Sequence, residues 1–304
     1  MGAQMDFEVI AEGLSFPEGP VVMADGSVIV VEIRRGAVTR CWGQGKTEII
    51  AEVGGGPNGA ALGPDGALYI CNNGGFGWNA THPMQMGEGY SGGRIERLNL
   101  STGKVERLYD RCGDYPLRGP NDLVFDRQGG FWFTDYGKEM GRVRDKGGLY
   151  YATPDGREIR EIDFGNSGSN GVGLSPDERT VYVAETSASR LWAYDLEVPG
   201  VIRRQKGPYP GRVVGAVPRL QFFDSLAVTA SGRICVATVL EGAIVSFSPN
   251  GDYVQFPTPD RYTTNICFGG REMTDAYITF SKSGQLVKTQ WPEPGLRLNF
   301  SDVV

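Results

Sequence analysis

Six segments of the chain repeat the same order of polar and apolar positions. Each begins with a small polar or acidic residue, continues with a short apolar run, turns about seven residues later and resumes with a β-branched or aromatic run. Short apolar runs joined by pairs such as Asp-Gly are typical of β-hairpins and not of helices. The six segments are FPEGPVVMADGSVIVVEI, GPNGAALGPDGALYICNN, GPNDLVFDRQGGFWFTDY, GSNGVGLSPDERTVYVAE, FFDSLAVTASGRICVAT and TTNICFGGREMTDAYITF.

A third strand is predicted after each hairpin and a fourth after most of them. The third strands include residues 36–42, 93–98, 148–152, 190–195 and 242–246, and the fourth strands include residues 48–53, 105–109 and 159–163. Six units of four strands predict an all-β, six-bladed β-propeller with four antiparallel strands in each blade. We expect it to occupy residues 1–304 as a single domain. A two-sheet sandwich is the alternative, but it gives no reason for six copies of one motif.

The N-terminal segment is predicted to complete the last blade and close the ring. FEVIAEG, close to the N-terminus, matches the phase of EIIAEVG, which is a predicted fourth strand. Residues 7–12 would then pair with the C-terminal repeat, and closure leaves no exposed sheet edge. Insertions interrupt the repeat at residues 74–92, 137–147 and 198–218.

The polar residue that opens each repeat is predicted to lie at one mouth of the central channel, because the first strand of each blade lines that channel. These six pivot residues are Glu18, Asn58, Asn121, Asn170, Asp224 and Asn265. An Asn in this position is commonly a turn residue. Two carboxylates in one narrow mouth, however, repel each other unless a positive charge lies between them.

No pivot residue is Lys or Arg, so a divalent cation is the simplest source of that charge. Glu18 and Asp224, with Asn170 or Asn121, would form an all-oxygen site. Such a site suits Ca²⁺, Mg²⁺ or Mn²⁺ and tolerates Fe²⁺ or Zn²⁺. The pattern therefore predicts a metal site at the mouth of the channel.

Composition and charge narrow the class of protein further. The chain has 45 glycines without a Gly-X-Y period and is 40% hydrophobic, which excludes collagen-like and disordered chains. Its net charge of −6 argues against a nucleic-acid partner or an anionic membrane partner. Five scattered cysteines, no recognisable signal peptide and no long apolar run lead us to expect a cytoplasmic protein. Cys71 and Cys235 are expected in the core.

Five motifs, in this order and phase, resemble the senescence-marker-protein/gluconolactonase (regucalcin-like) family of six-bladed propeller lactonases. They are FPEGP, GPNDL, SNG, FDS and CFGG, and the resemblance covers essentially the whole chain. It implies that one divalent ion (Ca, Zn, Mn, Mg or Fe(II)) is held by Glu18, Asn170 and Asp224.

The same resemblance implies that Asn121 contacts the substrate, with Asp122 beside it. Some family members carry an Arg two residues before this Asn, where the present chain has Gly119. Arg118 is one position earlier, and the sequence leaves open whether it replaces that contact.

The activity implied by the resemblance is hydrolysis of a lactone, in the gluconolactonase or xylonolactonase manner, to an aldonic acid. A Ser-His-Asp nucleophile is absent from the sequence, because His82 is the only histidine and there is no G-x-S-x-G motif. Water activated at the metal is the economical route, with Asp224 as ligand and general base and Asn121 at the developing oxyanion. Further contacts to a hydroxyl-rich small-molecule substrate are expected from loop residues, namely Asn72, Asn73, Trp78, His82 and Tyr136.

Two other functional classes stay open at this point. Related propellers hydrolyse organophosphates at a similar metal site, so a phosphotriesterase-like hydrolase is one alternative. A metal-binding propeller without catalytic activity is the other. A condensing enzyme of the strictosidine-synthase type is disfavoured, because that chemistry is expected to use a Glu base without metal. The oligomeric state is not indicated.

Overall fold

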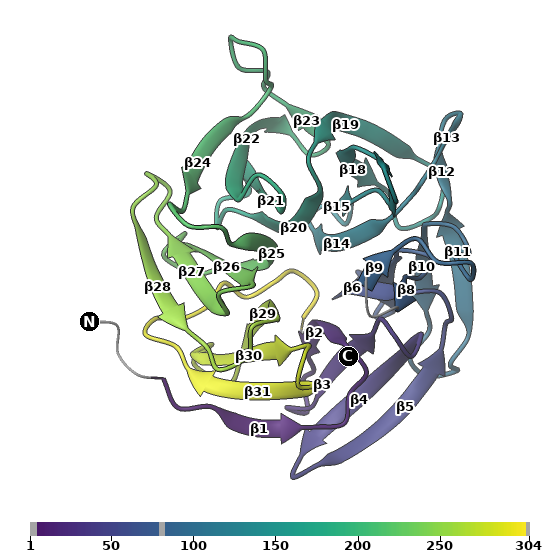
Figure 1. Ribbon diagram of the computed structural model, residues 1–304, viewed down its shortest axis with the longest axis vertical. Helices are drawn as coiled ribbons and strands as arrows, with labels where there is room; N and C mark the ends of the chain where they lie inside the picture. Colours follow the sequence, from purple (N-terminus) through teal and green to yellow (C-terminus); the bar gives the residue numbers. More distant parts are fainter. Residues whose placement is uncertain (1–4, 79–82, 302–304) are drawn as a thin grey trace.

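The computed structural model describes residues 5–78 and 83–301, and six β-sheets surround a central channel (Figure 1). Every pairing between neighbouring strands is antiparallel. The sheets are β2 (Pro17–Val22), β3 (Val28–Glu32), β4 (Ala37–Gly43) and β5 (Lys46–Glu52); β6 (Pro57–Leu62), β7 (Leu68–Asn72), β10 (Arg94–Leu98) and β11 (Val105–Tyr109); β14 (Pro120–Phe125), β15 (Phe131–Asp135), β18 (Gly147–Ala152) and β19 (Ile159–Asn166); β20 (Ser169–Leu174), β21 (Thr180–Glu185), β22 (Arg190–Val198), β23 (Val201–Ile202) and β24 (Arg212–Ala216); β25 (Phe222–Val228), β26 (Ile234–Val239), β27 (Ala243–Phe247) and β28 (Tyr253–Pro257); and β29 (Thr263–Gly269), β30 (Asp275–Phe280), β31 (Gln285–Gln290) and β1 (Glu8–Ala11).

The predicted six-bladed propeller is confirmed, and so is its closure by the N-terminal strand. Strand β1 pairs with β31, with Glu8 opposite Lys288 and Val9 opposite Val287. In Figure 1 the first strand, in purple, accordingly lies beside the last one, in yellow. The last blade therefore joins the two ends of the described chain.

The insertions account for the structure that the repeat did not predict. The fourth blade takes its outer strand β24 from within residues 198–218, a segment that the repeat marks only as an insertion. Two other insertions form short hairpins, β8 (Gly77–Trp78) with β9 (Pro83–Gln85) and β16 (Glu139–Met140) with β17 (Val143–Arg144). A third hairpin, β12 (Arg111–Cys112) with β13 (Tyr115–Pro116), follows the second blade.

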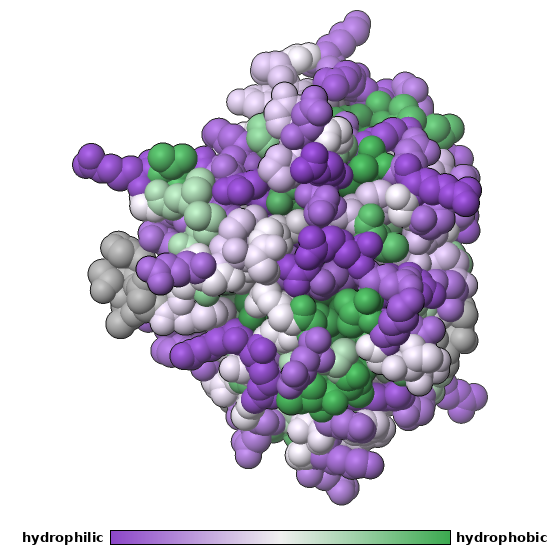
Figure 2. Space-filling view, turned by 90° about the vertical axis from the view of Figure 1, so that its right-hand side faces the viewer, coloured by the Kyte–Doolittle hydropathy of each residue, from purple (hydrophilic) through white to green (hydrophobic). Residues whose placement is uncertain are grey.

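The core lies between neighbouring blades. The second strand of a blade is buried along almost its whole length, and its side chains pack against the blades on either side; Phe131 and Phe133 of β15, for example, pack with Tyr69 of β7. Cys71 and Cys235 are buried in these strands, as predicted, and their thiols are free. The outer strands β5 and β19 have no buried residue and carry several exposed polar side chains, and hydrophilic residues interrupt the small apolar patches on the side of the molecule in Figure 2.

Every inner strand has an irregular register next to its pivot residue. The shift falls between Glu18 and Val21 in β2, and equivalent shifts occur in the other five inner strands β6, β14, β20, β25 and β29. A bulge of this kind locally redirects a side chain away from the alternating pattern of the strand. The six bulges therefore mark the level of the channel at which the pivot residues lie.

The far end of the channel is closed by the C-terminal segment, residues 291–301. Leu296 N donates to Val228 O at 2.9 Å, and the Asn299 amide donates to Phe125 O at 3.0 Å and to the Glu178 carboxylate at 2.7 Å.

Within the described parts of the chain, no helix is long and apolar enough to cross a membrane.

Candidate active site at the channel mouth

The pivot residues meet around the axis because their strands approach each other closely there. A Cβ added to Gly19, next to Glu18, would lie 2.8 Å from the backbone of Asn58 and of the residue two positions after Asn58. A Cβ on Gly59 would lie 2.5 Å from the Asn121 carbonyl oxygen. Glycine after the pivot thus lets neighbouring strands come together at the mouth. The sequence prediction that these residues converge is consistent with this geometry.

The first and last blades are connected by a direct contact between their pivots. The Asn265 amide donates to Glu18 Oε2 at 2.8 Å, and the same oxygen accepts from Gly19 N at 2.9 Å. Glu18 is 2% exposed. Its second carboxylate oxygen makes neither of these contacts.

Two amide oxygens at the mouth are buried without a hydrogen-bond donor. They are Oδ1 of Asn121 and Oδ1 of Asn170. The Asn170 amide nitrogen does have a partner, since it donates to Thr186 Oγ1 at 3.1 Å and so fixes the orientation of the side chain. Buried polar atoms are nearly always hydrogen-bonded, so two such oxygens in one cluster call for an explanation.

Three carboxyl groups share this cluster, and each has a raised pKa. Burial, opposed in part by the Asn265 hydrogen bond, raises the pKa of Glu18 to about 7. Burial and then the charge of Glu18 raise the pKa of Asp122 to about 7. The same two causes hold the pKa of Asp224 well above its usual value, with the Asn170 amide acting in the opposite direction. The mouth therefore concentrates negative charge that its own residues do not neutralise.

The donor set fits a hard divalent cation. In residues 5–78 and 83–301, no three His, Cys, Asp or Glu side chains form a group that could hold a metal by themselves. A metal bound here would need amide oxygens as well as carboxylates, and the donor-free oxygens of Asn121 and Asn170 are of that chemical type. Oxygen ligands from carboxylates and amides are the set that Ca²⁺, Mg²⁺ and Mn²⁺ prefer.

Buried polar residues at the ends of the second strands hold the backbone just before the pivots. Asp135 accepts hydrogen bonds from the backbone nitrogens of Arg118 and Gly119, both at 2.7 Å. In other blades, Asn72 accepts from Gly56 N at 2.9 Å and Glu185 from Ser167 N at 2.7 Å. The sequence analysis missed this role, although the signal was present: the second apolar run ends in an acidic or amide residue in VVEI, YICNN, FTDY and YVAE.

The predicted substrate residues fall into different environments. Trp78 packs against Phe16 with ring centres 5.1 Å apart, so it lies beside the strand that carries Glu18. Tyr136 lies close enough to Asp224 for that charge to contribute to its raised pKa, of which burial is the main cause. Arg118 is engaged within the protein, because its Nε lies 2.9 Å from Asp145 Oδ2. His82 lies outside the described residues.

A buried lysine that the sequence analysis missed joins two mouth loops. Lys138 is 1% exposed, and its ammonium group donates to Asn73 Oδ1 at 3.1 Å and to Gly75 O at 2.9 Å. It also lies 3.9 Å from the centre of the Phe76 ring. Burial lowers its pKa to about 7. Asn73, predicted to contact substrate, thus serves as an acceptor for Lys138 in this structure.

Fold and site together define a six-bladed propeller with an oxygen-donor cluster at one mouth of its channel. The sequence model of the SMP-30/gluconolactonase/LRE-like region matches residues 16–282. The chain therefore belongs to the SMP-30/gluconolactonase/LRE-like family, and the resemblance drawn from the motifs is confirmed.

Two of the relatives with a named activity are lactonases. The chain is 25% identical over 318 aligned positions to a gluconolactonase from Zymomonas mobilis, which covers 93% of this chain and 81% of that protein. It is 27% identical to lactonase drp35 from Staphylococcus saprophyticus over 80% of this chain and 69% of that protein. At the level of the family, these relatives support a hydrolase.

Solved structures share the fold over nearly the whole chain. A gluconolactonase from Xanthomonas campestris aligns with a TM-score of 0.74 at 21% identity, covering 95% of this chain and 90% of that one. A calcium-binding protein, regucalcin, from Agrobacterium tumefaciens also aligns with a TM-score of 0.74, at 19% identity, covering 97% and 98%. At these identities the likeness shows the fold alone.

Proposed function

We propose that this protein is a metal-dependent lactonase that opens a sugar lactone to its hydroxy acid at the channel mouth. One observation carries the proposal: the oxygens of Asn121 and Asn170 are buried without donors beside the carboxyl groups of Glu18, Asp122 and Asp224. This arrangement is costly for a protein that binds no cation there. The lactonase relatives supply the reaction class.

Glu18, Asn170 and Asp224 would hold the ion. When bound, a divalent ion supplies a Lewis acid for the ring carbonyl and lowers the pKa of water. Asp224 is the residue best suited to accept a proton from the attacking water, because it is less buried than Glu18. Asn121, another pivot residue, would orient the lactone through its amide.

Aromatic side chains shape the entrance above these groups. Trp78 packs against Phe16 and, in an edge-to-face contact with ring centres 6.0 Å apart, against Phe76. Such a wall can contact the C–H face of a sugar ring and exclude water from one side of the site. Tyr136 stands near Asp224 and offers a hydroxyl group to the hydroxyls of a substrate.

The test combines metal removal with a choice of esters. Chelated protein, and the same protein reloaded with Ca²⁺, Mn²⁺ or Zn²⁺, would be assayed by pH-stat with aldonolactones and, separately, with an aryl phosphotriester. We expect acid release from a lactone that chelation abolishes and metal restores. Release of the aryl group alone would indicate a phosphotriesterase. Stoichiometric metal binding without turnover of either ester would indicate a binding protein.

A further inference from the structure

Arg144, a cationic residue near the mouth, has no acidic partner among the described residues. Arg144, on β17, donates from Nη1 to Ser187 Oγ, and its guanidinium carbon lies 5.0 Å from the centre of the Tyr136 ring. Its Nε and Nη2 are buried without any hydrogen-bond acceptor. Glu139 stands opposite Arg144 in the hairpin register, yet the two side chains form no ion pair among the described contacts.

Two other cations near this mouth are satisfied within the protein. Arg118 pairs with Asp145, and Lys138 donates to Asn73 and to a backbone carbonyl. Arg144 therefore differs from both of them. Leaving buried donors unpaired costs free energy, so its position is not explained by the stability of the fold.

The two unpaired nitrogens form one edge of the guanidinium group. Nε–H and one Nη2–H are parallel and spaced to match the two oxygens of a carboxylate, which is the basis of bidentate Arg–carboxylate pairing. Ser187 and the Tyr136 ring hold the remaining parts of the group. The free edge is thus oriented before any ligand arrives.

This edge lies beside the predicted metal ligands. A Cβ added to Gly168 would lie 2.7 Å from Arg144 Nη2 and 2.7 Å from the Tyr136 ring, and Gly168 comes two residues before Asn170. The charge of Asp224 in turn contributes to the raised pKa of Tyr136, so these two side chains lie near each other. Because both nitrogens are buried, the Tyr136 ring or the short β16–β17 hairpin would have to move for a ligand to reach them.

We propose that Arg144 binds a carboxylate of the substrate, so that the preferred lactone carries a carboxylate group in addition to its ring ester. The inference rests on the proposed lactonase function. The ring ester would lie at the pivots and the carboxylate at Arg144, on the side of the mouth formed by the fourth blade. A neutral aldonolactone would leave the Arg144 edge unpaired.

A matched pair of lactones tests this substrate class. D-glucono-1,4-lactone and D-glucaro-1,4-lactone have the same ring and differ at C6, which is CH₂OH in the first and carboxylate in the second. We expect kcat/KM of the metal-loaded protein to favour the glucarolactone by about tenfold or more, as one charge-assisted bidentate contact predicts. Arg144→Gln should remove that preference while changing kcat/KM for the gluconolactone less than about threefold.

Arg160→Gln is the matched control, because Arg160 also stacks on a tyrosine but lies on outer strand β19 and pairs with Glu158. It should leave the preference intact. Arg144→Lys keeps the charge without the planar edge and should recover only part of the preference. Equal loss for both lactones in Arg144→Gln, or a wild-type protein without preference, would overturn the proposal.

Binding measurements separate this inference from the proposed function. Calorimetry with glucarate and gluconate requires no turnover, and melting temperatures show whether each variant is folded. If neither lactone is hydrolysed after metal is supplied, the lactonase proposal fails. Tighter binding of glucarate that is lost in Arg144→Gln would still support the carboxylate site, whereas equal binding of glucarate by wild type and variant would refute it.

Discussion

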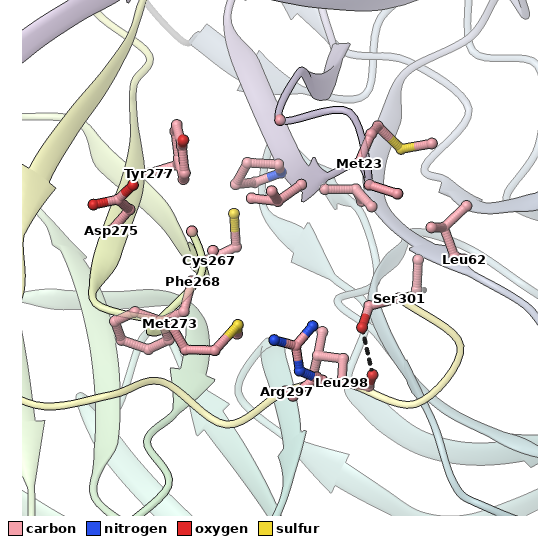
Figure 3. A pocket seen from close by; sticks show the side chains of 18 of the residues that line it. Met23, Leu62, Cys267, Phe268, Met273, Asp275, Tyr277, Arg297, Leu298 and Ser301 are labelled. Atoms are coloured by element: carbon pink, nitrogen blue, oxygen red, sulfur yellow. Dashed lines mark hydrogen bonds between the residues drawn. The ribbon is translucent and has the colours of Figure 1, made fainter. Parts of the chain in front are cut away.

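The two ends of the channel are built from the same six inner strands but differ in chemistry. At the mouth, each strand carries an Asn, Asp or Glu next to a bulge, and the buried amide oxygens of Asn121 and Asn170 lack hydrogen-bond donors. At the far end the same strands finish in apolar residues, and a cavity of about 600 Å³ lies among them. Figure 3 shows this cavity, with Met23, Leu62, Phe268 and Met273 around it and Leu298 and Ser301 of the C-terminal segment at its edge.

The larger cavity therefore lies away from the groups that can perform chemistry. A second, smaller space of about 70 Å³ lies between the two ends, and its lining includes Asp122 and Asn265 as well as Leu296 and Leu298. By cavity volume alone, the far end would be chosen as the binding site. The unpaired oxygens and the mutually repelling carboxyl groups lie at the mouth instead, and they are the features that a metal and a substrate would satisfy.

The largest effect is expected at Asp224, if the mouth and not the far end is the reaction site. Asp224→Asn keeps the size of the side chain but removes both a ligand charge and the proposed base. Loss of a general base typically lowers kcat by about 10²–10⁴. Steady-state kinetics at saturating metal, with metal occupancy measured in parallel, checks this.

Glu18→Gln is the companion variant, because it removes a ligand charge without removing the base. Its metal affinity should fall, and excess metal should restore most of its activity. Unchanged metal binding in Glu18→Gln would contradict the assignment of Glu18 as a ligand. Rescue of Asp224→Asn by metal alone would show that Asp224 is not the base.

Asn121→Ala is expected to have the next largest effect. It tests whether Asn121 and Asn170, whose amide oxygens both lack donors, have different roles. Both Asn121 Oδ1 and Asn170 Oδ1 lack donors, but we assign Asn170 to the metal and Asn121 to the substrate. Loss of an oriented group at a developing oxyanion costs about 10²–10³ in kcat. If Asn121→Ala loses its metal, Asn121 is itself a ligand; Asn170→Ala should lose metal and provides the comparison.

The contrast between the two ends also shows which features a sequence can predict. The repeat predicts the mouth, because each pivot precedes an apolar run at the same position in the phase. It does not predict Lys138 or Arg144, whose hydrogen-bond partners belong to other blades and become neighbours only through folded insertions. Nor does it predict the far end, where the C-terminal segment belongs to no repeat and crosses the channel through contacts such as that of Asn299 with Phe125.

The two ends should also differ in how they contribute to the pH dependence of stability. The folded, metal-free protein holds Glu18 and Asp122 at pKa values of about 7, above the ordinary values of 4.5 and 3.8. The folded state therefore keeps protons that the unfolded chain releases, and this contribution to stability is full below about pH 4 and is lost as pH rises through 7. A divalent ion bound at the mouth would take the place of the protons on these carboxyl groups.

We therefore expect the melting temperature of chelated protein to fall between pH 5 and 8, and added Ca²⁺ to raise it more at pH 8 than at pH 5. Metal affinity should weaken below pH 7 by up to about tenfold per pH unit for each proton displaced. Glu18→Gln should flatten both trends. A melting temperature that depends on pH identically with and without metal would contradict the coupling of protons and metal at the mouth.

The smallest effect on activity is expected at Asn299, which fastens the C-terminal segment across the far end. Its amide donates to Phe125 O and to Glu178, and Asn299→Ala removes both hydrogen bonds. A net loss of about 1–2 kcal/mol in the free energy of unfolding is expected, because one of the two acceptors is charged. Metal affinity and kcat should remain within about twofold of the wild-type values, since Phe125 and Glu178, the acceptors of the Asn299 amide among the described residues, are not pivot residues. Denaturant unfolding and lactone kinetics on the same preparation check both statements, with Asn121→Ala as the variant of opposite behaviour. A substantial fall in kcat for Asn299→Ala, without loss of metal, would show that the far end takes part in the reaction and would remove the distinction between the two ends.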